Sequence, residues 1–153
     1  MATLRAAAAL SLLAIAGCSL VPGREPGPPG PIRLQVTAGA RLNPDELGNS
    51  LPTAVRVYQL KGVGKTSSAE LGALLREPKE VLGEDFLGVE EVFVEPNGAA
   101  QKTISREKET RALMVVAVVR RPSGDGWRLV KELTSTDPVD LAVTVDEYRL
   151  VAR

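Results

Sequence analysis

The chain of 153 residues contains no histidine and a single cysteine. Histidine is the commonest general base and a frequent metal ligand, so its absence argues against the usual forms of acid–base and metal chemistry. One cysteine cannot form a disulfide within the chain. The folded part must therefore draw its stability from its core.

Aromatic residues are also scarce, at 3% of the chain, and neither sign of charge dominates, with 19 basic and 19 acidic residues. Pockets for small ligands are usually lined by aromatic and other apolar side chains. Nucleic-acid binding calls for a basic face. Composition therefore favours neither kind of partner.

A long apolar run is missing as well, since the apolar stretch at residues 6–16 is shorter than the roughly 20 residues needed to cross a bilayer. With Arg5 before it and small residues after it, this stretch fits a secretory signal peptide. Ala16 and Gly17 lead directly into the lone Cys18, and this junction resembles the lipobox of bacterial lipoproteins. An ordinary signal peptide with an accidental cysteine near its end is the alternative.

The lipobox resemblance implies that residues 1–17 are removed and that Cys18, now the first residue, carries lipid on its thiol and its amine. One acyl chain binds a membrane only marginally, with a constant of about 10⁴ M⁻¹, so three chains on one residue would give a stable anchor. Ser19 stands where an Asp retains lipoproteins in the inner membrane in the best-studied sorting systems. We therefore expect an outer-membrane protein, held in the inner leaflet and facing the periplasm.

Residues 18–31 comprise the lipidated cysteine and a tether rich in proline and glycine. Its prolines fix φ and lack backbone donors, so they disfavour helix and central strand and favour an extended chain. At about 3.1 Å per residue, residues 19–31 would reach on the order of 40 Å. The tether is interpreted as a spacer.

Residues 32–153 have the size of one domain and read mainly as strands. Alternation of apolar and polar residues predicts a half-buried strand at residues 32–38 and another at 127–133. Residues 112–119 are apolar throughout, which predicts a central strand covered on both faces. Further strands are predicted at residues 54–60, 89–94 and 102–105, with turns at "EPNG" and "PSGDG".

Two other features complete the expected fold. The apolar positions of the last strand change parity after Asp146 and Glu147, which predicts a β-bulge there or, alternatively, a strand that crosses between sheets. A short helical insertion is expected near residues 67–82, capped by Ser67 or Ser68 and interrupted at Pro78. The pattern predicts a two-sheet β-sandwich with a short helical insertion.

Candidate catalytic motifs are weak. "GVGKTSS" lacks the first glycine of a phosphate-binding loop, because position 59 is Gln, and it is interpreted as a turn between a strand and a helix. The acidic pairs in "PDEL", "GEDF", "VEEV" and "VDEY" are typical of solvated turns and strand edges, and the alternating charges of "SREKETR" predict a solvated hairpin connection. No enzyme activity is predicted.

The stretch "RLNPDELGNSLPTAVRVYQLK" leaves the first strand, forms a polar loop and enters the second. It resembles the outer-membrane lipoproteins of type VI secretion systems, the TssJ group. "LGED", "EPNG", "MVVAVVR" and "GWR" extend the resemblance over nearly all of the domain. Two positions depart from the group's pattern. Members commonly have an aromatic residue where this chain has Leu71, and often have one before the Arg that ends the apolar strand, where this chain has Val119. The matching residues are Leu42, Asn43, Pro44, Pro52, Val55, Arg56, Tyr58, Gln59, Leu60 and Lys61.

This resemblance implies a transthyretin-like β-sandwich with no cofactor other than the covalent lipid on Cys18. It also implies that the loop at residues 39–52 docks onto the periplasmic C-terminal domain of the large inner-membrane component. From the residues alone the loop reads as a long hairpin connection, although loops of this length are uncommon without a function. A free-standing periplasmic lipoprotein that binds a ligand or inhibits an enzyme is the alternative. The implied partner-binding residues are Leu42, Asn43, Pro44, Asp45, Glu46, Leu47, Gly48 and Asn49. These residues interrupt the strand alternation, so we expect most of them to be exposed. Leu42 and Leu47 are expected to offer apolar contacts, and Asp45 and Glu46 are expected to offer charges that steer a basic partner surface.

Overall fold

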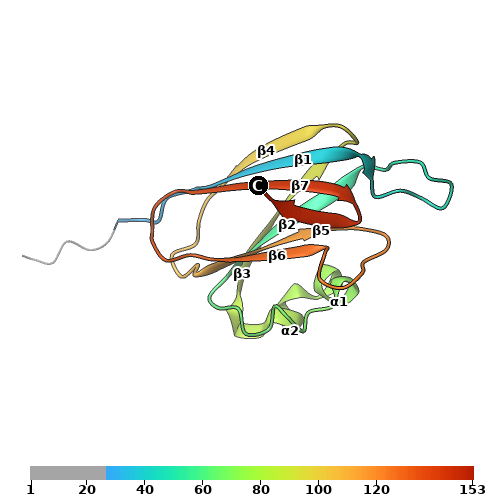
Figure 1. Ribbon diagram of the computed structural model, residues 1–153. Helices are drawn as coiled ribbons and strands as arrows, with labels where there is room; N and C mark the ends of the chain where they lie inside the picture. Colours follow the sequence, from blue (N-terminus) through green and yellow to red (C-terminus); the bar gives the residue numbers. More distant parts are fainter. Residues whose placement is uncertain (1–26) are drawn as a thin grey trace, which may run out of the picture.

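The computed structural model describes residues 27–153, which form two stacked sheets with two short helices against one of them (Figure 1). Cys18, Ser19 and the predicted cleavage site lie outside the described residues. The strands are β1 (Ile32–Leu42), β2 (Thr53–Leu60), β3 (Phe86–Val94), β4 (Ala99–Ile104), β5 (Ala112–Ala117), β6 (Arg128–Glu132), β7 (Val139–Glu147) and β8 (Arg149–Ala152). The helical segments are α1 (Leu71–Arg76), α2 (Pro78–Leu82) and the 3₁₀ turn Gly83–Asp85.

Each sheet has four strands. The first sheet runs β4-β1-β7-β8, with β1 and β7 parallel, and the second runs β3-β2-β5-β6, with all neighbours antiparallel. The predicted two-sheet β-sandwich with a helical insertion is confirmed. None of the helices within residues 27–153 is long and apolar enough to span a bilayer.

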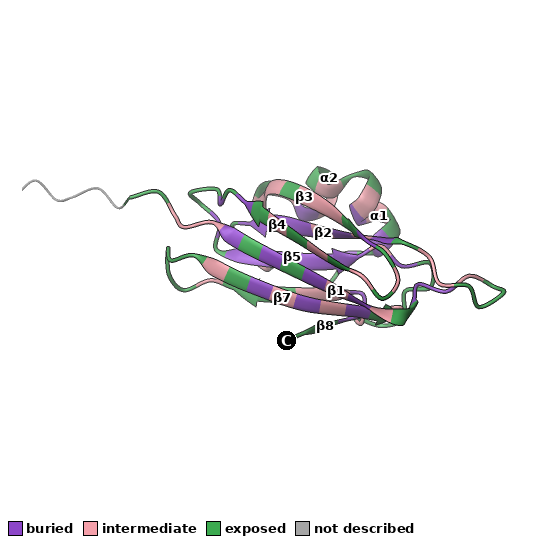
Figure 2. Cartoon of the chain, turned by 90° about the horizontal axis from the view of Figure 1, so that it is seen from above, coloured by how far each residue is buried: buried purple, intermediate pink, exposed green. Residues whose placement is uncertain are grey.

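Alternating side chains build the core between the sheets. Ile32, Leu34 and Val36 of β1 are buried, whereas the residues between them face outward, and the same banding is visible along β7 (Figure 2). β5 is buried at all six positions, as predicted for a central strand. Its second face is covered because α1 and α2 lie against this sheet, with Leu74 fully buried.

The predicted bulge in the last strand near Asp146 and Glu147 is wrong, because the irregularity of the β1–β7 pairing at this point falls between Ala38 and Leu42 of β1. The alternative of a crossing strand is wrong as well. The chain reverses there, and β8 returns antiparallel beside β7 in the same sheet, with Val145 opposite Leu150. Glu147 makes the reversal with a positive φ of 49°. Because a two-residue turn pairs odd positions with even ones, the parity change marks a hairpin rather than an inserted residue.

The predicted serine caps of the helix are also wrong, because α1 begins at Leu71 and its capping position, Glu70, makes no side-chain cap bond. The turn before the helix is held instead from β6. The Arg128 guanidinium donates to the carbonyls of Thr66, Ser67 and Ala69, each at 2.7 Å. A distant arginine therefore fixes the turn before the helix, although a guanidinium only donates and cannot accept from the free N–H groups of the first helical turn.

The "SREKETR" segment is not a solvated hairpin connection, since it joins β4 of the first sheet to β5 of the second. Arg106 and Thr110 within it are buried. The side chain of Gln59 holds the crossing: its oxygen accepts from Glu107 N and Thr110 Oγ1, both at 2.9 Å, and its nitrogen donates to Ser105 O. Alternating charge did not reveal this buried amide.

The chain enters the sandwich at one end, and the connection between β1 and β2 projects from the other (Figure 1). At the entry end, Gly30 N donates to Thr136 O at 2.7 Å and Val139 N donates to Pro31 O at 2.9 Å. A Cβ on Gly30 would lie 2.4 Å from the backbone nitrogen of Pro138, so this close approach requires glycine. Eleven residues of β1, about 36 Å at 3.3 Å each, separate the two ends.

Candidate docking site

The connection between β1 and β2, residues 43–52, extends beyond the sheets as the projecting loop in Figure 1. We call it the β1–β2 loop. It contains most of the residues that the sequence implied for partner binding. Leu42, which precedes it, is the last residue of β1.

The base of this loop is buried, contrary to the expectation that most of the candidate residues would be exposed. Leu42 is fully buried in the core, so the prediction that it offers an apolar contact to a partner is wrong. Asn43 is 5% exposed, and Pro44 is buried as well. The base is covered because two other segments at this end of the sandwich, residues 118–126 and the β7–β8 turn, bond to it.

Asn43 joins the loop to both segments. Its side-chain oxygen accepts from Arg120 N at 2.8 Å, and its own N–H donates to Glu147 O at 2.8 Å. It adopts φ of 44°, a left-handed conformation that Asn tolerates better than most residues. Tyr148 adds a third link, since its hydroxyl donates to Pro44 O at 2.8 Å.

Asp45 closes the outer part of the loop on itself. Its carboxylate accepts from the backbone N–H groups of Leu47 and Asn49, both at 2.8 Å, and from the Asn49 side-chain amide at 3.0 Å. The backbone N–H of Asp45 donates to Asn49 O at 2.9 Å. The Asn49 side chain, followed by its backbone N–H, lowers the pKa of Asp45 below its ordinary value. The carboxylate is therefore ionised at neutral pH and fixes the loop.

The tip that this closure presents consists of Glu46, Leu47, Gly48 and Asn49, all exposed. Leu47 is 87% exposed, and Gly48 makes the turn beside it with φ of 85°. Glu46 lies 3.1 Å from the Arg120 guanidinium, but both side chains are largely solvated, so this pair contributes little. The tip thus offers one apolar side chain on a hydrogen-bonded loop.

Asp45 and Glu46 were both expected to steer a basic partner, but their carboxylates lie in different surroundings. Asp45 uses its carboxylate within the loop, whereas Glu46 faces Arg120 and solvent. Sequence reasoning missed Arg120 and Tyr148, which brace the loop from positions more than 70 residues away. No local pattern in the sequence indicates these contacts, although the positive-φ tolerance of Asn43 is a weak signal of a special turn.

Two of the acidic residues singled out in the sequence form ion pairs with basic residues of the sheets. In "VEEV", Glu90 pairs with Lys102 at 2.7 Å, and Glu91 pairs with Arg56 at 2.5 Å. Within residues 27–153 there is no group of three or more His, Cys, Asp or Glu side chains that could hold a metal ion. These carboxylates are structural ion pairs on the sheets.

Comparison with known proteins gives a family and a fold. Residues 31–148 match the family described as T6SS-SciN: Type VI secretion lipoprotein, VasD, EvfM, TssJ, VC_A0113. The crystal structure of the T6SS lipoprotein TssJ1 from Pseudomonas aeruginosa superimposes with a TM-score of 0.72 at 26% identity, covering 82% of this chain and 98% of that one. Among curated proteins there is no significant match.

Two further solved structures share the fold. A chain in a structure described as "Type VI membrane complex" has a TM-score of 0.74 at 24% identity, covering 81% of this chain and 98% of that chain. A chain in a structure described as "T6SS protein TssM C-terminal domain (869-1107) from EAEC" has a TM-score of 0.68 at 23% identity, covering 80% and 97%. The sandwich is therefore the fold of this group.

Proposed function

Since this chain belongs to the TssJ family of type VI secretion lipoproteins, we propose that its β1–β2 loop docks the periplasmic C-terminal domain of the large inner-membrane component, TssM. The observation that carries the proposal is the hydrogen-bonded loop that projects from one end of the sandwich with Leu47 at its tip. The similar chain found in a structure described as the TssM C-terminal domain supports the choice of partner. The protein would then be a structural component of the membrane complex.

The loop is suited to binding because it is ordered before a partner arrives. The bonds of Asp45 and Asn43 fix its backbone, so little conformational entropy remains to be lost on association. Burying the exposed Leu47 would contribute about 1.5–3 kcal/mol. A few well-packed residues usually carry most of the binding energy of an interface, and Leu47 is the residue of this loop with the most apolar surface to bury.

The second part of the proposal places the protein in the cell. Cys18 carries the lipid, Ser19 permits transfer to the outer membrane, and the domain hangs in the periplasm from the inner leaflet. This part is supported by the family, which consists of lipoproteins, and by the position of the chain entry relative to the β1–β2 loop. Because the described chain enters at the end opposite the β1–β2 loop, the loop would point away from the membrane that holds the lipid (Figure 1).

The alternative, a lipoprotein that binds a small ligand, receives less support. A surface cavity of about 450 Å³ lies on the outer face of the first sheet, but its lining includes Arg33, Gln35 and Gln101 and no aromatic side chain. Ligand pockets are usually apolar with a few placed polar groups. The family is a family of structural lipoproteins and is not known for enzyme activity.

The proposal is tested by affinity purification of the tagged protein from detergent-extracted membranes. Recovery of the large inner-membrane component with the wild-type chain, together with loss of that component when Leu47 is replaced by Asp, is the expected result. The matched control replaces Val151, another exposed apolar residue on β8 of the first sheet, by Asp. Failure to recover the component with wild-type protein would overturn the proposal.

A further inference from the structure

A cavity of about 410 Å³ lies beside the base of the β1–β2 loop. It is formed between the connection that follows β5 and the β7–β8 turn, two segments that meet where Leu150 N donates to Gly126 O at 2.7 Å. Its lining residues are Arg121, Ser123, Gly124, Asp125, Gly126, Glu147, Tyr148 and Arg149.

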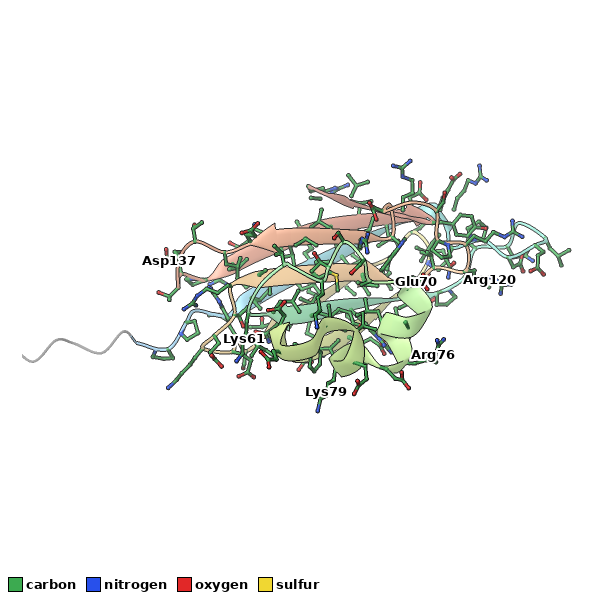
Figure 3. All side chains as sticks on the ribbon, turned by 90° about the horizontal axis from the view of Figure 1, so that it is seen from below. Lys61, Glu70, Arg76, Lys79, Arg120 and Asp137 are labelled. Carbon is green, nitrogen blue, oxygen red and sulfur yellow. The ribbon has the colours of Figure 1, made fainter. Side chains whose placement is uncertain are left out.

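Two residues in the wall of this cavity are hydrogen-bonded to the base of the β1–β2 loop. Tyr148, in its wall, donates to Pro44 O, and Glu147, also in its wall, accepts from Asn43 N. Arg120, next to Arg121, lies at the same end of the molecule, far from Lys61 and Asp137 at the entry end (Figure 3). A partner bound to the loop would therefore lie beside the cavity.

The cavity has an excess of unpaired positive charge, because both of its acidic residues form ion pairs with arginines outside its lining. Asp125 pairs with Arg128, and Glu147 pairs with Arg41 at 3.2 Å. Arg121 and Arg149 have no ion-pair or side-chain hydrogen-bond partner among residues 27–153, and both are exposed. The stem of Arg149 lies across Gly126, where a Cβ would meet its Cγ and Nε atoms at 3.4 Å. Two free guanidinium groups thus line one recess.

We propose that this cavity is a second contact for the protein docked by the β1–β2 loop, and that it receives an acidic side chain of that partner. The proposal rests on the docking function proposed above. Guanidinium groups bind carboxylates through short, charge-assisted and often bidentate hydrogen bonds. The cavity is polar and lies beside the base of the loop whose tip carries Leu47, so one partner could contact an apolar anchor and a charged recess at the same end of the sandwich, an arrangement common at interfaces.

The test replaces both cavity arginines by glutamine, R121Q/R149Q, and measures binding of the full-length lipoprotein in detergent to the purified periplasmic domain of TssM by calorimetry. Because both arginines are exposed and unpaired, the melting temperature should stay within about 2 °C of wild type. The matched control, K108Q/K131Q, removes the same charge from exposed lysines in the 105–111 connection and on β6. We expect the cavity variant to bind about tenfold more weakly and the control to bind as wild type does.

Salt dependence identifies the nature of the contact. Wild-type affinity should fall between 50 and 300 mM NaCl because a charged contact is screened, and the cavity variant should show a shallower fall. Equal affinity and equal salt dependence for wild type and R121Q/R149Q would overturn the cavity proposal while leaving the loop proposal intact. If the wild-type protein does not bind the domain at all, the docking function itself fails, so the two failures are distinguishable.

Discussion

Replacing Asn43 with alanine should destabilise the sandwich by about 2–3 kcal/mol, although the residue begins a surface loop. The change removes the oxygen that accepts from Arg120 N at 2.8 Å, and a backbone N–H left without its partner costs about 1–2 kcal/mol. Asn43 also has φ of 44°, where alanine is disfavoured by roughly 1 kcal/mol. The two terms are independent, so they should add.

For a domain of about 120 residues, 1 kcal/mol corresponds to roughly 4 °C in melting temperature. N43A should therefore melt about 8–12 °C below wild type when unfolding is followed by circular dichroism. The matched control is N43D, which keeps an acceptor oxygen and tolerates the left-handed conformation, and it should lose less than half as much. If N43A melts within about 2 °C of wild type, the bond from Arg120 does not hold the loop base, and the account of a braced loop is refuted.

Three further predictions concern the anchor, the sorting signal and the loop. Cys18→Ser should leave an unprocessed precursor that still folds, and radiolabelled palmitate remaining on this variant would contradict the assignment of the lipid site. Ser19→Asp should hold a lipidated protein in the inner membrane, as measured by membrane fractionation, whereas unchanged outer-membrane recovery would exclude this sorting role. Because the pKa of Asp45 is lowered below 3.8 in the folded state, its loop bonds should persist at pH 5 and be lost as the pH falls through that lowered value. The amide proton shifts of Leu47 and Asn49 report this loss, and a titration midpoint at or above 3.8 in those shifts would contradict the lowered pKa.

Much of the fold could be predicted from the sequence because each strand carries its own pattern. Alternation in β1 and the unbroken apolar run in β5 report directly which faces are buried. The parity change near Glu147 is visible in the sequence, but a hairpin and a bulge leave the same mark on a one-dimensional pattern, so the pattern alone does not predict the hairpin. Only the pairing of Val145 with Leu150 separates the two.

The candidate site could be predicted only in part. Its position after the first strand followed from the resemblance, but the burial of Leu42 depends on the length of β1, which extends four residues beyond the predicted end. The contacts of Asn43 with Arg120 and of Tyr148 with Pro44 join segments more than 70 residues apart. Such contacts are set by how the two sheets stack, and nothing local in the sequence encodes them.

The measurement that tests the central claim most directly is calorimetric titration of the TssM periplasmic domain with a variant in which residues 45–49 are replaced by a Gly/Ser segment of equal length. The replaced residues lie beyond the buried base, so the melting temperature should stay close to that of wild type, while the loss of Leu47 and of the ordered tip should weaken binding at least tenfold. Equal affinity with and without the native tip would show that the partner binds another face of the sandwich and would contradict the account.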